Sequence, residues 1–72
     1  MSKETAFFVY LIECYSEYKG LSAPKVLGQW DQYELTDLIY DMYEIYHVER
    51  LQNAFDDIDE LIKEKQSQLA NS

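Results

Sequence analysis

Apolar residues recur three or four positions apart along most of the chain, which is the spacing of one face of a helix. The pattern predicts an all-α fold, a compact bundle of three to four short helices. We expect residues 1–66 to form a single small helical domain. The polar residues 67–72 are expected to form a frayed C-terminal tail.

The first helix is predicted from about Glu4 to Tyr18. Its apolar side chains form two neighbouring rows, so we expect this helix to be covered on more than one side and to lie at the centre of the bundle. Gly20 follows and is expected to end the helix by adopting the left-handed backbone conformation. The first row is Phe8, Leu11, Ile12, Tyr15 and Tyr18, and the second row is Phe7, Tyr10 and Cys14.

A short second helix is expected to begin after Ser22, whose hydroxyl can accept a hydrogen bond from a first-turn amide. Pro24 suits the first turn because its missing N–H has no helical partner there. Gly28 lies inside this helix and costs about 1 kcal/mol relative to Ala, so tertiary contacts must hold the helix. Its apolar face is Val26, Leu27, Trp30 and Tyr33.

The third helix is predicted to start at Thr36, which is an N-cap candidate, or one turn earlier near Glu34. A break in the helical pattern is expected within residues 48–52. The core face of this helix comprises Leu35, Leu38, Ile39, Met42, Ile45 and Tyr46.

The fourth helix is predicted from about Ala54 to Gln66, with Asn53 as its N-cap. Acids crowd its start and lysines come late, which is the order that the helix dipole favours. The apolar positions alternate steps of four and three, so they form either a face packed against the first helix, which we favour, or a seam for self-association. These positions are Val48, Leu51, Phe55, Ile58 and Ile62.

Charge narrows the choice of partner. The 72 residues contain fourteen acids and six Lys or Arg, a formal net charge of −8. Nucleic-acid binding rests on Lys and Arg that neutralise phosphates, so neither nucleic acid nor an anionic membrane is expected as a partner. A protein with a basic surface would be attracted by the same field. The composition therefore favours a basic protein partner.

Cysteine usage and hydropathy suggest a cytoplasmic protein. Cys14 is the single cysteine, so no disulfide and no cysteine-based zinc site can form within one chain. The apolar run Ala6 to Ile12 is too short for a membrane span and lacks a cleavage site for a signal peptide.

Two rows of residues on the third helix form the candidate partner-binding site. The acids Glu34, Asp37, Asp41 and Glu44 share one stripe, and Tyr40, Tyr43 and His47 form a row beside it. A tyrosine next to an acid can receive an Arg side chain through cation–π contact and charge pairing together. A solvated acidic face, or a groove in which the fourth helix lies, is the alternative interpretation.

Catalysis and cofactors find little support in the sequence. Glu44 and His47 have the spacing of one half of a carboxylate di-iron site, and only a symmetric dimer would supply the second half. Asp56, Asp57 and Asp59 lack the glycine turn of a calcium loop. No nucleophile with a base at recognisable spacing and no phosphate-binding loop is present. We therefore expect a protein without catalytic residues, metal or cofactor.

Short motifs also suggest a family. They are Phe8, Ile12-Glu13, Tyr15, Leu21-Ser22, Val26, Ile39, Tyr43, His47 and Asp57-Ile58. In this order they resemble a family of small bacterial domains of unknown function, although Val48, Glu49 and Arg50 replace the turn with small polar residues and glycine that is more frequent there.

The resemblance carries expectations of its own. Such proteins are often encoded beside proteins that resemble ADP-ribosyltransferase toxins, which implies an antitoxin or accessory role. The matched residues Glu13, Tyr15, Tyr43, His47, Asp57 and Ile58 are expected to form a buried polar network.

Three hypotheses follow from the sequence. The leading one is a non-catalytic, acidic protein-interaction module that docks a partner with a basic surface, and the resemblance implies that this partner is a toxin-like enzyme. The alternatives are a self-associating structural protein that forms a homodimer and, third, a metal-dependent enzyme assembled across a dimer.

Overall fold

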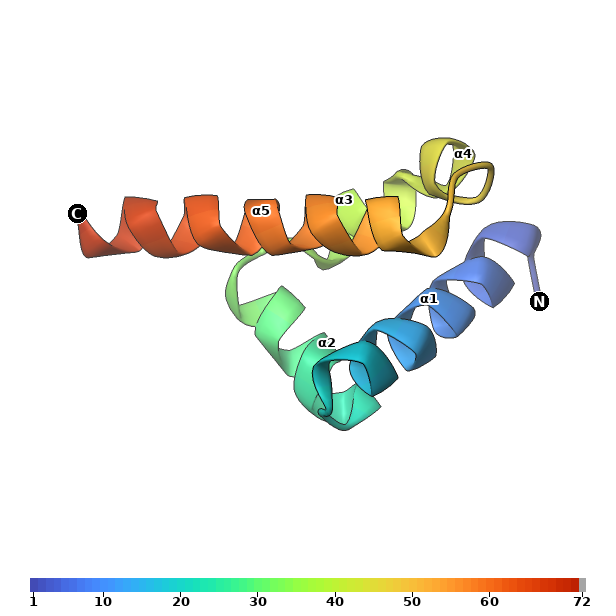
Figure 1. Cartoon of the computed structure of the whole chain (residues 1–72), viewed down its shortest axis with the longest axis horizontal. Helices are drawn as coiled ribbons and strands as arrows, with labels where there is room; N and C mark the ends of the chain where they lie inside the picture. The colour runs from blue at the N-terminus through green and yellow to red at the C-terminus, as the bar shows by residue number, and fades with distance from the viewer. Residues whose placement is uncertain (72) are drawn as a thin grey trace.

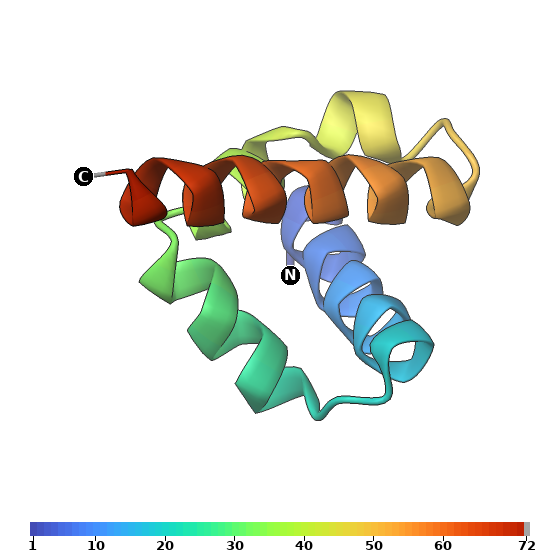
Figure 2. The ribbon, with the colours of Figure 1, turned by 60° about the vertical axis from the view of Figure 1, so that its left-hand side comes forward.

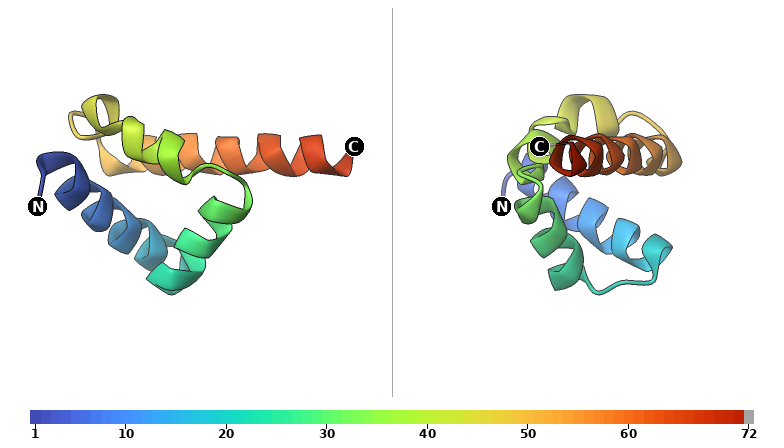
Figure 3. Two further views of the ribbon diagram at one scale, coloured as in Figure 1. Left: turned by 180° about the vertical axis from the view of Figure 1, so that it is seen from behind. Right: turned by 90° about the vertical axis from the view of Figure 1, so that its left-hand side faces the viewer.

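The computed structural model describes residues 1–71 and confirms the all-α fold. Over these residues the helices are α1 (Lys3–Lys19), α2 (Ala23–Gln32), α3 (Thr36–Asp41), α4 (Tyr43–Tyr46) and α5 (Leu51–Ala70), and there is no strand. In Figure 1, α1 and α2 form a hairpin on one side of α5, and the two termini lie at opposite ends of the molecule. Figure 3 shows α3 and α4 along the far side of α5.

The α1–α2 hairpin is closed by two capping motifs that the sequence predicts. Gly20 has a left-handed conformation, with φ of 70°, and its amide donates to the carbonyl of Glu17 at 3.2 Å. The amide of Leu21 donates to the carbonyl of Ser16 at 2.9 Å. The hydroxyl of Ser22 then accepts from the amide of Lys25. Both predicted boundaries are confirmed.

The turn between α2 and α3 departs from the prediction. Glu34 has a positive φ of 58° and lies in this turn, where the amide of Leu35 donates to the carbonyl of Trp30 at 2.8 Å. Thr36 is the first residue of α3 and does not cap it, because its hydroxyl instead donates to the carboxylate of Asp31. Glu34 therefore lies outside the helix that the sequence assigned to it.

The predicted third helix is divided at Met42, whose ψ of 9° ends α3 before α4 begins. Its core face is also narrower than expected, since Leu38 and Ile45 are 45% and 50% exposed. Each precedes a buried residue, Ile39 or Tyr46, and so points about 100° away from it. The prediction that Leu38 and Ile45 lie in the core is wrong.

The last helix is longer than predicted at both ends. The break before it is confirmed, but α5 begins at Leu51 after an extended Arg50. Asn53 is not a cap, because it lies inside α5 and its amide donates to the carbonyl of Arg50 at 3.0 Å. The first turn of α5 consequently contains no acid. The predicted acids lie one turn further into the helix, where they interact less favourably with the positive end of the helix dipole. Residues 67–70 continue the helix; their fraying remains a prediction.

The core is built around Trp30, which is fully buried on α2. Its ring lies 5.6 Å from that of Tyr15 on α1 and 5.9 Å from that of Phe8. Its indole N–H has no hydrogen-bond partner among the described residues. Leu11, Ile12 and Tyr15 of the predicted face of α1 are buried, whereas Tyr18 is half exposed.

Helix α5 crosses the α1–α2 hairpin, as Figure 2 shows. The ring of Phe55 lies 5.6 Å from Tyr15 and is stacked on Tyr18 at 4.9 Å. Phe55, Ile58 and Ile62 are all buried in the monomer, which confirms the favoured packing. Of the predicted seam, Val48 alone is largely exposed, at 73%, and self-association remains a prediction. Because α1 contacts α2, α3, α4 and α5, its central place is also confirmed.

Candidate protein-docking site

An open depression of about 390 Å³ brings four of the seven predicted partner-binding residues together. Tyr40 and Asp41 come from the end of α3, and Tyr43 and Glu44 come from the start of α4. The bend at Met42 places these two pairs around one hollow instead of along one straight helix. The lining is completed by Glu4 and Ile45.

Tyr40 is held in place by the first turns of α1. Its hydroxyl is 2.8 Å from the hydroxyl of Thr5, and its ring meets the ring of Phe8 edge to face at 5.3 Å. The hydroxyl of Ser2 in turn donates a hydrogen bond to the hydroxyl of Thr5 at 3.0 Å. The half-buried ring therefore presents a fixed face to the depression.

Tyr43 is fixed by two aromatic neighbours. Its ring meets the ring of Phe7 edge to face at 5.7 Å and is stacked on the imidazole of His47 at 4.2 Å. The imidazole is held in turn, because its Nδ1–H donates to the carbonyl oxygen of Tyr43 at 2.6 Å. His47 is exposed and does not line the depression, but its ring is stacked on Tyr43, which does.

The charge of the depression comes from three exposed carboxylates, those of Glu4, Asp41 and Glu44. Within residues 1–71, none of the three accepts a side-chain hydrogen bond or forms an ion pair. No Lys or Arg of the described part of the chain lines the depression. An incoming cation therefore meets carboxylates that are still available.

The remaining predicted site residues lie apart from the depression. Glu34 is in the α2–α3 turn, and Asp37 is exposed on α3 without lining the hollow. The single acidic stripe predicted from the sequence is thus wrong, because it assumed one continuous helix. Sequence reasoning also missed Glu4, which reaches the site only through the packing of α1 on α3 and α4.

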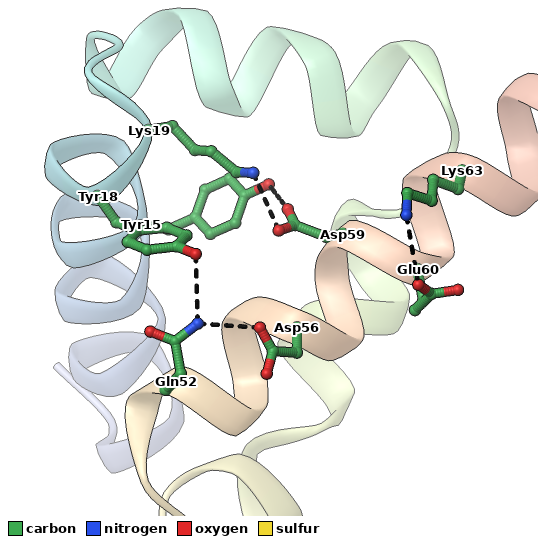
Figure 4. A network of polar contacts seen from close by, with 8 residues as sticks. All are labelled: Tyr15, Tyr18, Lys19, Gln52, Asp56, Asp59, Glu60 and Lys63. Carbon is green, nitrogen blue, oxygen red and sulfur yellow. Dashed lines mark hydrogen bonds and ion pairs between the residues drawn. The ribbon is translucent and has the colours of Figure 1, made fainter.

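A second polar network joins α1 to α5 (Figure 4). The hydroxyl of Tyr15 donates to Asp59 at 2.6 Å, and the ammonium of Lys19 pairs with the other oxygen of that carboxylate at 2.9 Å. Burial, followed by the hydrogen bond and charge of Asp59, raises the pKa of the Tyr15 hydroxyl. Gln52 bridges the helices nearby by donating to Tyr18 at 3.3 Å and to Asp56 at 2.9 Å.

A matching pair joins α4 to α5, where the hydroxyl of Tyr46 donates to Asp57 at 2.6 Å. Burial is again the largest cause that raises the pKa of this hydroxyl, and Asp57 adds to it. Glu13 and His47 are exposed and take no part in either pair. The prediction of one buried network from the family motifs is therefore wrong. The structure contains two separate tyrosine–aspartate pairs, which fasten α5 to the rest.

The described residues, 1–71, also bear on metal binding and on membrane insertion. They contain no group of three or more His, Cys, Asp or Glu side chains placed to hold a metal ion. In the same range, every helix is too short or too polar to cross a membrane.

Comparison with known proteins identifies a family. The family model described as "Protein of unknown function (DUF3791)" matches residues 6–65, which is most of the chain. No significant match was found among curated proteins or among solved structures. The chain therefore belongs to the DUF3791 family, a family of unknown function.

Proposed function

We propose that this protein is a non-catalytic interaction module that docks a protein partner with a basic surface. The observation that carries the proposal is the convergence of three unpaired carboxylates, from Glu4, Asp41 and Glu44, with two fixed tyrosine rings around one open depression. Charge and aromatic surface occur there together.

The chemistry of the depression suits an Arg side chain. A guanidinium is planar, can pair with a carboxylate through two parallel hydrogen bonds and can stack on an aromatic ring. Glu44 and Asp41 offer the carboxylates, while Tyr40 and Tyr43 offer the rings. A cation–π contact at an exposed site contributes about 0.5–1 kcal/mol, so several such contacts are needed for a specific complex.

Preorganisation favours a binding role. Thr5 and Phe8 hold Tyr40, and Phe7 and His47 hold Tyr43, before any partner arrives. An immobilised side chain otherwise costs about 0.5–1.5 kcal/mol on binding. The rings therefore lose little freedom when a partner docks.

The openness of the depression argues for docking and against catalysis. Its three carboxylates are exposed to solvent, whereas charge stabilisation in enzymes is strongest in sites that exclude water. Solvent-exposed charges of this kind steer association and select partners.

The family resemblance suggests what the partner is. We infer a toxin-like enzyme encoded next to this protein, which the docked module would mask as an antitoxin. Attraction between a negatively charged module and a basic enzyme surface would speed their association, most strongly at low salt.

Coexpression with the product of the neighbouring gene tests the proposal. A tagged wild-type chain should retain the neighbour's product through size exclusion. The double variant Asp41→Lys, Glu44→Lys should lose it, because the reversed charges repel a basic surface. The control Glu17→Lys, Glu64→Lys makes the same change in net charge at exposed acids elsewhere and should keep the complex.

The outcomes separate the parts of the proposal. Wild-type chain that elutes free of the neighbour's product would exclude this partner. Equal loss of the complex in both double variants would show that only net charge matters, and the depression would then not be the docking site.

A further inference from the structure

Helix α4 separates the docking depression from a second one. The second depression has a volume of about 430 Å³ and lies between α4 and α5. Ile45 lines both hollows, so α4 forms the ridge between them. Figure 1 shows α4 at the end of the molecule where α1 and α5 begin. The residues that line the second depression are Ile45, Tyr46, Glu49, Asn53, Asp56, Asp57 and Glu60.

The ridge is apolar and lies open to solvent. Ile45 is 50% exposed, and Val48, which follows α4, is 73% exposed. Neither residue is among the buried or partly buried hydrophobic side chains of the core. Interfaces typically place apolar side chains at the centre and charged groups at the rim. This ridge has that arrangement, with a charged hollow on either side.

The two hollows concentrate the negative charge of the protein. Three acids line the first and four line the second, which is half of the fourteen in the chain, and no Lys or Arg within residues 1–71 lines either one. In the second hollow Asp57 accepts from Tyr46, Asp56 accepts from Gln52, and Glu60 forms an exposed ion pair with Lys63 at 3.6 Å. Each carboxylate has further acceptor capacity, because it can accept about four hydrogen bonds.

We propose that α4 is the centre of a two-sided docking surface for one amphipathic, basic helix of the partner. This inference rests on the proposed function and deepens it. An apolar side chain of the partner helix covers Ile45 and Val48, and one basic side chain enters each hollow. Charge complementarity selects this occupant, since a second copy of this chain would bring its own net charge of −8 against the same surface.

The geometry sets the spacing of the two basic residues. A helix with its side chains is about 10–12 Å across, so the hollows on either side of α4 lie about that far apart. Residues seven positions apart in a helix are separated by about 10 Å along its axis. The partner helix therefore carries Arg or Lys at positions i and i+7, with an apolar residue at i+3 or i+4 on the same face.

A synthetic peptide tests this inference without knowledge of the natural partner. The probe is an alanine-based helix of about 15 residues, long enough to be helical, with Arg at i and i+7 and Leu at i+4. Titration into the isotope-labelled protein should shift the amide signals of residues that line both hollows and of Val48. A control peptide that moves one Arg to the opposite face should bind more weakly.

Variants of the protein assign the contribution of each hollow. Glu49→Lys with Asp56→Lys in the second hollow, and Ile45→Gln on the ridge, should each weaken peptide binding by about tenfold or more. All three positions are exposed, so the fold should be kept, and a helical spectrum like that of the wild type checks this. Glu17→Lys with Glu64→Lys again serves as the control for net charge.

The outcomes distinguish this inference from the proposed function. If only Asp41→Lys with Glu44→Lys weakens peptide binding, the two-sided surface is refuted and the docking depression stands. Absence of peptide binding, or shifts confined to the separate groove that Val9 and Leu27 line, also refutes the two-sided surface. Coexpression with the neighbour's product still tests the proposed function independently in those cases.

Discussion

Replacement of Gly28 by Ala should stabilise the protein. Gly28 lies inside α2, is exposed, and a Cβ built on it meets no atom within 4 Å. No packing reason for glycine therefore exists in the folded chain. Glycine in a helix interior costs about 1 kcal/mol relative to Ala, because the unfolded chain loses more conformational freedom and the helix gains no side chain. We expect Gly28→Ala to recover about that amount.

The other glycine supplies a matched control. A Cβ on Gly20 also meets no atom within 4 Å, but this residue has a φ of 70°. A side chain in the left-handed region costs about 1–2 kcal/mol. Gly20→Ala should therefore lower the free energy of unfolding, although the two substitutions are chemically identical and neither creates a clash. Changes of opposite sign in the free energy of unfolding of the two variants would isolate the effect of the backbone conformation.

Thermal and urea unfolding followed by circular dichroism measure both effects. In a domain of this size, about 1 kcal/mol corresponds to about 4–8 °C in the melting temperature. Gly28→Ala should raise the midpoint by that amount and Gly20→Ala should lower it. A change of the same sign in both variants would refute the reasoning, because the surroundings would then matter more than φ.

Three further outcomes are expected. Glu34→Gly should raise the free energy of unfolding by about 0.5–1 kcal/mol in urea, since Glu34 has a φ of 58°; a loss of stability would contradict this. Ser22→Ala should lower it by about 1 kcal/mol through the lost cap of α2, and Ser22→Gly by less. Folding favours the protonated Tyr46 hydroxyl, whose pKa is raised from a usual value of about 10, so that stability is present below about pH 10 and lost as pH rises further. Tyr46→Phe should show a smaller loss of stability in urea from about pH 9 to about pH 11 than the wild type, and an identical slope would refute this account.

Local chemistry made the first half of the fold predictable. Gly20 and Ser22 act through their immediate neighbours, so the end of α1 and the start of α2 could be predicted from the sequence alone. The apolar spacing of Phe55, Ile58 and Ile62 likewise predicted the face of α5 that packs inward. In these places local preference and tertiary packing agree.

The rest depended on contacts between distant residues. The local sequence predicted Thr36 as a cap, because it could not show that the Thr36 hydroxyl bonds the carboxylate of Asp31 instead. Asp31 belongs to the preceding helix and is brought near by the turn at Glu34. No glycine or proline lies near Met42, so the sequence does not predict the bend there. Without that bend, neither the grouping of the site residues nor the contribution of Glu4 follows from helical spacing.

The isolation of the Trp30 indole gives the protein a built-in optical reporter. Trp30 is the single tryptophan of the chain, and its ring lies among aromatic side chains of α1 with its N–H shielded from water. Its emission should accordingly be blue-shifted in the native state and move to longer wavelength only when α1 and α2 separate. A titration that leaves this spectrum unchanged while α4 binds a ligand would show that recognition takes place without opening the interior.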